Sequence, residues 1–295
     1  MGAKLRQTRR RIRSIESTKR ITKAMELIAA SRILRAQQMV RQSRPYAELI
    51  TQVIQNVASQ IDEVAHPMLE QRSAPTSAAV VVVTSDRGLA GAYNSNVLRT
   101  TEELLARVRG HGLEPKMFVT GRKGISYFRF RERPVEASWR GFSETPSYDD
   151  AKTVADAVIE AFTSGAVDEI HLAYTEFTSA MVQRPVARRL VPMVVEETAE
   201  RPPGPLPLYI FEPAPEKIFA DLLPRYVEAR VYSAMLESAA SEQAARRRAM
   251  SAATDNAEEL IKVLTRVANQ ARQSEITQEI MEIVGGAEAM AGQGA

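Results

Sequence analysis

The sequence of 295 residues contains no cysteine. This absence excludes a disulfide framework, a thiolate nucleophile and any metal or cluster site built on thiolates. Histidine is scarce as well, because His66, His111 and His171 are the three in the chain, and their separation matches no spacing of metal ligands. A metal site is therefore not expected.

Long apolar runs are also missing from the sequence. No stretch of about 18 apolar residues is available to span a bilayer, and the N-terminus lacks the apolar block of a signal peptide. We therefore expect an intracellular chain in a reducing compartment, which can still dock on a membrane assembly.

Glycine and proline are almost absent from both ends of the chain. Residues 3–64 contain one proline, Pro45, and no glycine, while residues 225–284 contain neither. Apolar residues recur there every three or four positions, which predicts two long helices. We expect Pro45 to kink or briefly break the first helix, and Pro224 to mark the start of the second helix or a kink near it.

Each long helix is predicted to carry a contact seam, the stripe of residues that packs against another helix. A helix of this length needs a partner of similar length to cover its stripe, so the two ends of the chain are predicted to pair as an antiparallel coiled coil. Two separate helices packed on a globular domain remain the alternative. The expected seam residues are Ile21, Met25, Ile28, Tyr46, Ile50, Val53 and Val57 on the first helix, and Ala253, Ala257, Leu260, Leu264, Val267 and Ala271 on the second.

Between the long helices the pattern changes to short strands that alternate with shorter helices. The alternation predicts a central three-layer α/β domain with a parallel sheet. The chain is thus divided into an N-terminal long helix (1–64), a central α/β domain (65–212) and a C-terminal long helix (213–295). Strands are expected at residues 79–84, 116–120, 169–175 and 208–211, and helices at residues 94–109 and 150–164.

The stretch SDRGLAGAYNSNV (85–97) follows a run of valines, where many enzymes keep a phosphate-binding loop. It holds only Gly88 and Gly91, whereas a dinucleotide fingerprint needs three glycines, and the lysine and hydroxyl of a phosphate loop are missing. We interpret the stretch as a turn without a nucleotide. Because no G-x-S-x-G or H-E-x-x-H motif occurs either, we expect no catalytic residue and no cofactor.

Charge is distributed unevenly along the chain. The first 44 residues hold thirteen Lys or Arg and two Glu, a balance of +11, and the remainder has a balance of −8. Such a basic segment indicates an acidic partner, which can be a protein loop, an anionic membrane surface or a nucleic acid. No aromatic side chain for base stacking occurs among the first 45 residues. A basic coiled-coil scaffold or nucleic-acid-binding protein stays open as the alternative function.

Three separated stretches resemble the gamma subunit of F-type ATP synthases of the bacterial type. They are TKRITKAMELIAASRI (18–33), SDRGLAGAYNSN (85–96) and ARQSEITQEIMEIVGGA (271–287), and RYVEARVY (225–232) and SEQAARRRAMSAATDNAEELI (241–261) extend the resemblance nearly end to end.

The resemblance implies a non-catalytic rotor shaft, present in one copy, that couples proton flow through a membrane ring to ATP synthesis or hydrolysis. It implies alpha and beta subunits (as a hexamer), an epsilon subunit and the c-subunit ring as partners, with no nucleic acid. The central domain is then a Rossmann-like foot, and the chain is peripheral on the cytoplasmic face of the cell membrane.

The resemblance also implies two sets of contact residues. For some of them a simpler explanation stays open, since Arg246 can pair with a carboxylate along the coiled coil and Met25 can pack in the seam. Contacts with the beta subunits are expected at Lys23, Met25, Arg87, Arg246, Gln273, Thr277, Glu279 and Glu282, and contacts with the rotor ring and epsilon at Tyr209, Phe211 and Glu212.

Overall fold

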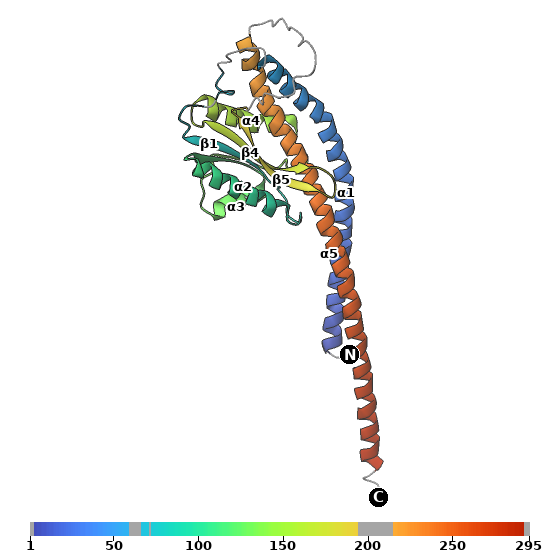
Figure 1. The fold of residues 1–295 in the computed structure, drawn as a ribbon. Helices are drawn as coiled ribbons and strands as arrows, with labels where there is room; N and C mark the ends of the chain where they lie inside the picture. The colour runs from blue at the N-terminus through green and yellow to red at the C-terminus, as the bar shows by residue number, and fades with distance from the viewer. Residues whose placement is uncertain (1–2, 59–65, 71, 194–214, 292–295) are drawn as a thin grey trace. The chain divides into compact units, whose positions relative to one another are not determined.

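The structure, a computed structural model, describes residues 3–58, 66–70, 72–193 and 215–291. Two compact units are present, a smaller one of Met1–Ile28 with Arg247–Ala295 and a larger one of Ala29–Arg246. The long helices α1 (Ala3–Ala58) and α5 (Pro215–Ala291) contribute to both units (Figure 1). The predicted division at residues 64 and 212 separates the two long helices from the α/β domain, whereas these units divide each long helix in two. The three-part division stays a prediction.

A five-stranded sheet forms the centre of the larger unit, in the order β3-β2-β1-β4-β5. The central strand β1 (Ser77–Val83) pairs in parallel with β2 (Glu114–Thr120) and β4 (Glu169–Phe177). At the edges, β3 (Ala137–Trp139) runs parallel to β2, and β5 (Gln183–Val191) runs antiparallel to β4. Every residue of β1 is buried, as expected for a parallel strand covered on both faces.

Helices cover both faces of this sheet (Figure 1). α2 (Tyr93–Gly110) and α3 (Arg122–Phe130) pack on the face that carries Val80 and Val82. α4 (Tyr148–Thr163) packs on the other face, together with the parts of α1 and α5 that belong to the larger unit. The predicted three-layer α/β domain is therefore confirmed, and its sheet is parallel as predicted except at the edge strand β5.

Three elements of this domain were not anticipated from the sequence. The helix α3 and the three-residue strand β3 are too short to show a clear period. The edge strand β5 reads QRPVARRLV, in which three arginines and a proline obscure the alternation. The strand expected at residues 208–211 lies outside the described residues.

The smaller unit is an antiparallel pair of helices, as predicted. Thr22 Oγ1 lies 2.8 Å from Thr254 Oγ1 in a buried hydrogen bond, and Lys19 Nζ donates to Glu258 Oε2 at 2.9 Å. Because the partner of the lower-numbered residue on α1 has the higher number on α5, the two helices run in opposite directions.

The register of the contact seam differs from the expected one. Ile21 and Ile28 are 58% and 52% exposed, whereas their neighbours Thr22 and Ala29 are buried. On α5 the expected Ala257 is buried, but Leu260 is 43% exposed. At these positions the small side chains are buried and allow close approach of the helix backbones, while the larger apolar neighbours are exposed. Tyr46, Val53 and Val267 are exposed as well, whereas Ile50 and Val57 are buried as expected.

Neither proline interrupts its helix. α1 continues through Pro45, and α5 begins at Pro215, nine residues before Pro224. Pro215 stands at the first helical position, where the missing backbone N–H has no partner to lose. In the ranges that the structure describes, no helix has the length and apolar character needed to cross a membrane.

Candidate functional site

The loop between β1 and α2 lies at the carboxyl end of the central parallel strand and is fixed to α2 by side-chain hydrogen bonds. The Ser85 N–H donates to Asn94 Oδ1 at 3.0 Å, and Asn94 Nδ2 donates to Ser85 Oγ at 2.8 Å. The Ser85 hydroxyl also reaches the carbonyl oxygen of Arg87 at 2.6 Å. These bonds fix the backbone on both sides of Asp86.

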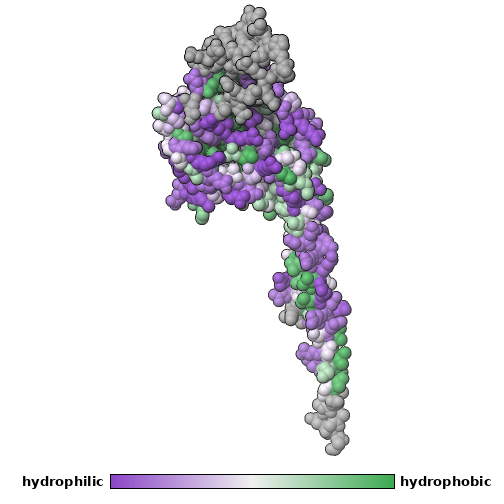
Figure 2. Space-filling model, viewed as in Figure 1, coloured by the Kyte–Doolittle hydropathy of each residue, from purple (hydrophilic) through white to green (hydrophobic). Residues whose placement is uncertain are grey.

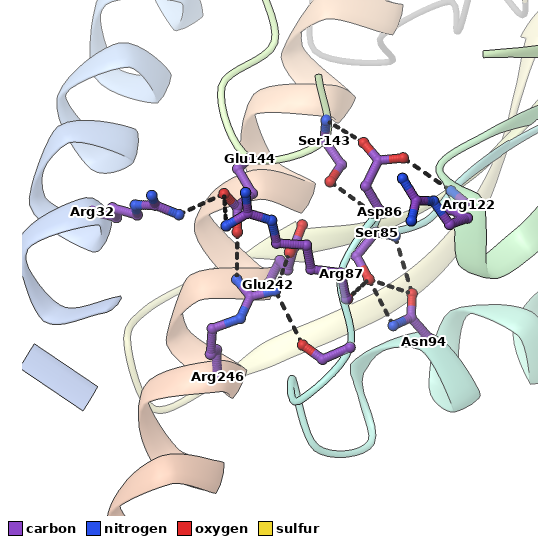
Figure 3. Close-up of polar contacts among 11 residues, drawn as sticks. Arg32, Ser85, Asp86, Arg87, Asn94, Arg122, Ser143, Glu144, Glu242 and Arg246 are labelled. Carbon is purple, nitrogen blue, oxygen red and sulfur yellow. Dashed lines mark hydrogen bonds and ion pairs between the residues drawn. The ribbon is translucent and has the colours of Figure 1, made fainter. Parts of the chain in front are cut away.

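The Asp86 carboxylate connects this loop to the ends of two neighbouring elements (Figure 3). Its Oδ1 accepts the Arg122 N–H at 3.0 Å, and its Oδ2 accepts the Gly141 N–H at 2.7 Å and the Ser143 N–H at 3.1 Å. Arg122 is the first residue of α3, so the negative charge also stabilises the N-terminus of that helix. One carboxylate thus holds the loop, α3 and the segment after β3 together.

Backbone conformation supports the close approach of these segments. Gly121 has φ +90°, and a Cβ there would lie 2.2 Å from the carbonyl oxygen of Thr84. Within the loop, Leu89 has φ 62°, a left-handed conformation that a side chain larger than glycine rarely adopts, and it is 61% exposed. The loop therefore projects Leu89 outward from a rigidly anchored base.

Glu144, from the segment after β3, gathers arginines from three parts of the larger unit (Figure 3). Its Oε2 lies 2.5 Å from Arg32 Nη1 on α1 and 3.5 Å from Arg87 Nη1 in the loop. Its Oε1 lies 3.3 Å from Arg246 Nη1 on α5. The Arg87 side chain is 69% exposed, and it is the most accessible member of this cluster.

Arg246 and Glu242 form a buried ion pair one turn apart on α5. Arg246 Nη2 lies 2.5 Å from Glu242 Oε1, and the two side chains are 5% and 1% exposed. Burial raises the pKa of Glu242 to about 7, although the nearby Arg246 opposes this shift. The same Nη2 lies 3.4 Å from the Gly88 carbonyl oxygen, so Arg246 also connects α5 to the loop. Arg246 thus pairs with a carboxylate on its own helix, as the simpler explanation predicted.

The loop offers few free groups to a phosphate or a metal ion. The backbone N–H groups of Ser85 and Asp86 donate to Asn94 and Ser143, respectively. Over the described residues, no three His, Asp or Glu side chains are placed to hold a metal ion. The arrangement is an ionic cluster that fixes a surface loop, with Arg87 at its accessible edge.

The remaining predicted contacts are divided between the smaller unit and the undescribed residues. Lys23 is exposed and pairs with Glu26 at 3.1 Å, while Met25 is half-buried. Near the end of α5 the Thr277 hydroxyl donates to the Gln273 carbonyl at 2.9 Å, one turn earlier. Gln273, Thr277, Glu279 and Glu282 are all exposed, and Tyr209, Phe211 and Glu212 lie outside the described residues.

Asp86, Glu144 and Glu242 have central positions that sequence reasoning missed. Glu242 and Arg246 did carry a signal, because oppositely charged residues at i and i+4 among alanines form a pair on one helix face. Asp86 and Glu144 carried none, since their partners are distant in sequence and only the fold brings them together.

Comparisons with known proteins cover the whole chain. The family model described as ATP synthase matches residues 4–290. The ATP synthase gamma chain of Parafrankia sp. is 60% identical over 99% of both chains, and that of Mycolicibacterium smegmatis is 53% identical over the same shares.

Solved structures agree in fold. A chain of the Euglena gracilis mitochondrial ATP synthase (OSCP/F1/c-ring) has a TM-score of 0.69 at 18% identity and covers 100% of this chain and 97% of its own. A chain of the central stalk and c-ring of the Tetrahymena thermophila mitochondrial ATP synthase has a TM-score of 0.59 at 26% identity, covering 79% of this chain and 99% of its own.

Proposed function

The chain belongs to the ATP synthase gamma-chain family, and from this membership we propose that it is the central rotor shaft of a bacterial ATP synthase. In this role it catalyses no reaction itself and couples proton flow to ATP synthesis or hydrolysis. It turns as a single copy inside a hexamer of alpha and beta subunits, with epsilon and the c-subunit ring at its foot. It is then peripheral on the cytoplasmic face of the membrane. The observation that carries the proposal is the antiparallel pairing of α1 and α5, in a chain that matches this family from residue 4 to residue 290.

The paired helices suit a part that transmits torque. In the smaller unit the buried seam positions include Thr22, Thr254 and Ala257, whose small side chains let the helices approach closely. The buried hydrogen bond between the two threonines opposes sliding of one helix along the other, since a slip leaves both hydroxyl groups without this partner. A pair of helices joined in this way resists bending and twisting more than a single helix does.

The outer surface of the smaller unit offers two kinds of contact. Arg10, Arg11, Arg13 and Arg20 on α1 are exposed, and we assign them to acidic surfaces of the beta subunits. Hydrophobic side chains are exposed along α5 (Figure 2), which suits an apolar bearing inside the hexamer. These include Ile276, Ile280, Met281, Ile283 and Val284. Lys23, Met25, Gln273, Thr277, Glu279 and Glu282 belong to the same proposed contact.

In the larger unit, Arg87 is the proposed contact with a catalytic subunit. Its exposed guanidinium is held 3.5 Å from Glu144, which Arg246 and Arg32 also contact. Arg246 is too deeply buried to meet a partner over much of its surface, and we assign it the positioning of the loop that carries Arg87. Tyr209, Phe211 and Glu212 are assigned to the ring and epsilon on the resemblance alone.

A reconstitution experiment tests the proposal. The purified chain is mixed with alpha, beta and epsilon subunits, and complex formation and ATP hydrolysis are measured, followed by ATP-driven proton pumping in vesicles that contain the membrane ring. We expect a complex with one copy of this chain, and weaker pumping when residues 271–295 are deleted. A chain that forms no complex with alpha and beta subunits but binds DNA would overturn the proposal in favour of the basic scaffold.

An Arg87→Ala variant separates the loop contact from the shaft. Because Arg87 is exposed, its loss should leave the unfolding of the isolated chain unchanged while lowering pumping per ATP hydrolysed. Arg99→Ala is the matched control, because Arg99 is also an exposed arginine but lies on α2 and not in the loop. Equal pumping by the Arg87→Ala and Arg99→Ala assemblies would remove the loop from the proposed contact.

A further inference from the structure

A cavity of about 490 Å³ lies between the C-terminal part of α2 and the strands β4 and β5. Glu169, the first residue of β4, lines it, so the cavity opens at the amino end of this parallel strand. The loop that carries Arg87 follows the carboxyl end of β1. Because β1 and β4 are parallel, this loop and the cavity lie at opposite ends of the strands. The cavity is therefore separate from the site described above.

The cavity combines an apolar floor with a polar rim, to which these residues contribute: Arg107, Arg189, His111, His171 and Glu169. Leu104, Val108 and Leu113 form the floor and are almost fully buried. Arg107 and Arg189 contribute guanidinium groups to the lining. A volume in the range of 300–1,000 Å³ is typical of small-molecule sites, and the polar groups of such a site fix the orientation of its ligand.

The charges around the cavity leave one cation without a partner. Glu169 Oε2 lies within hydrogen-bond distance of His171 Nε2, at 2.7 Å, and Glu169 Oε1 forms an ion pair with Arg189 Nη1 at 3.7 Å. The Arg107 guanidinium forms no ion pair or hydrogen bond with any residue that the structure describes. Burial lowers the pKa of His171, and Arg189 and Arg107 lower it further against the opposing effect of Glu169. With His171 neutral, these groups carry a net positive charge.

We propose that this cavity binds a small organic phosphate, with the phosphate on Arg107 and Arg189 and the organic part on the leucine and valine floor. Both arginines line the same cavity, together with His171, so their charges face one enclosed volume. Guanidinium groups present forked N–H donors that match phosphate oxygens, and a buried apolar floor favours a ligand larger than inorganic phosphate. This binding site does not depend on the proposed rotor function.

Calorimetric titration of the isolated full chain at 0.15 M salt tests the proposal, with AMP as the probe. We expect saturable binding of AMP, at least about tenfold weaker binding of inorganic phosphate, and no binding of adenosine. Arg107→Glu should weaken AMP binding at least about tenfold. Arg109→Glu is the matched control, because it makes the same charge change in the same last turn of α2 but lies outside the lining.

A second variant tests for a change in the opposite direction, that is, for stronger AMP binding. Glu169→Gln removes the carboxylate that competes with the ligand for Arg189, so it should strengthen AMP binding severalfold while keeping the side-chain shape. Absence of saturable AMP binding in the wild-type chain would overturn the proposal. It is also overturned if Arg109→Glu weakens binding as much as Arg107→Glu, or if inorganic phosphate binds as tightly as AMP.

Discussion

At the scale of single residues, the ionic cluster around Arg246 shows how burial changes the chemistry of a side chain. Glu242 is almost completely removed from water, and its charged form is stabilised chiefly by Arg246. Burial still dominates, so the pKa of Glu242 rises to about 7. The folded chain therefore retains a proton on Glu242 at pH values where the unfolded chain has released it, and the stability of the fold depends on pH near neutrality.

The first prediction concerns this pH dependence. Because the pKa of Glu242 is higher in the folded chain, its contribution is full below about pH 4.5 and is lost as the pH rises towards 7. In the wild type, the free energy of unfolding should therefore fall by at most about 3 kcal/mol as the pH rises through this range. In Glu242→Gln this decrease should be absent. Urea unfolding at pH 5 and pH 8 measures it.

The control for this prediction is Glu259→Gln, which removes an exposed carboxylate from the same helix. Its difference in unfolding free energy between pH 5 and pH 8 should equal that of the wild type. If Glu242→Gln shows the same difference as Glu259→Gln, the pH dependence does not arise from Glu242.

The second prediction concerns Arg246. Arg246→Met leaves the buried Glu242 without its cation and takes a partner from Glu144, so the free energy of unfolding should fall by about 3–5 kcal/mol at pH 8. Arg247→Met, which replaces the exposed neighbour, should change it by less than about 0.5 kcal/mol. Similar losses in the two variants, measured by urea unfolding, would contradict a structural role for the buried pair.

At the scale of the elements, the two long helices show that the size of an apolar residue does not by itself decide whether it lies in the contact seam. Ala257 and Thr254 are buried between the helices, whereas Leu260, which has the same periodicity, is 43% exposed. A stripe of leucine and isoleucine therefore lies beside the seam and is available to other subunits. The amino-acid pattern contained both stripes, and the packing of the two backbones decided which positions are buried.

The third prediction tests this register directly. Ala257→Leu adds volume to a close-packed seam and should lower the free energy of unfolding by about 1–3 kcal/mol. Leu260→Ala should lower it by less than about 1 kcal/mol, because the side chain already contacts water. Thermal unfolding of the two variants compares them. The opposite order of effects would restore the register expected from the sequence.

At the scale of the whole molecule, the isolated chain exposes apolar surface that its own fold does not use. Ile276 and Ile280 are 48% and 54% exposed on α5, in the part of the chain assigned to the hexamer. Such side chains contribute little to the stability of the chain alone, and under the proposed function they act on assembly. Stability of the subunit and function of the complex should therefore respond to different residues.

The fourth prediction follows from this separation. Replacing both Ile276 and Ile280 by serine should change the free energy of unfolding of the isolated chain by less than about 1 kcal/mol. The same change should reduce ATP-driven proton pumping by the reconstituted complex. Phe130→Ser, which removes an exposed apolar side chain from the larger unit, is the control and should leave pumping unchanged. Full pumping by the double variant would argue against an apolar bearing at these positions.

The sequence by itself determined the main elements of this protein and its family. Helical periodicity over long stretches without glycine predicted α1 and α5, the alternation of strands and helices predicted the α/β domain, and motifs in three regions pointed to the ATP synthase gamma chain. These features are local or repeated along the chain, so a pattern read in one dimension is sufficient to reveal them.

Only the tertiary structure decided which side chains meet. Glu144 contacts Arg32, Arg87 and Arg246, which are separated by as many as 112 residues from it, and no local pattern predicts such a cluster. The same applies to the cavity beside Arg107, which is assembled from α2, β4 and β5. Helical periodicity predicts that one face of a helix is apolar. Which residues of that face become buried depends on how closely the two helix backbones pack.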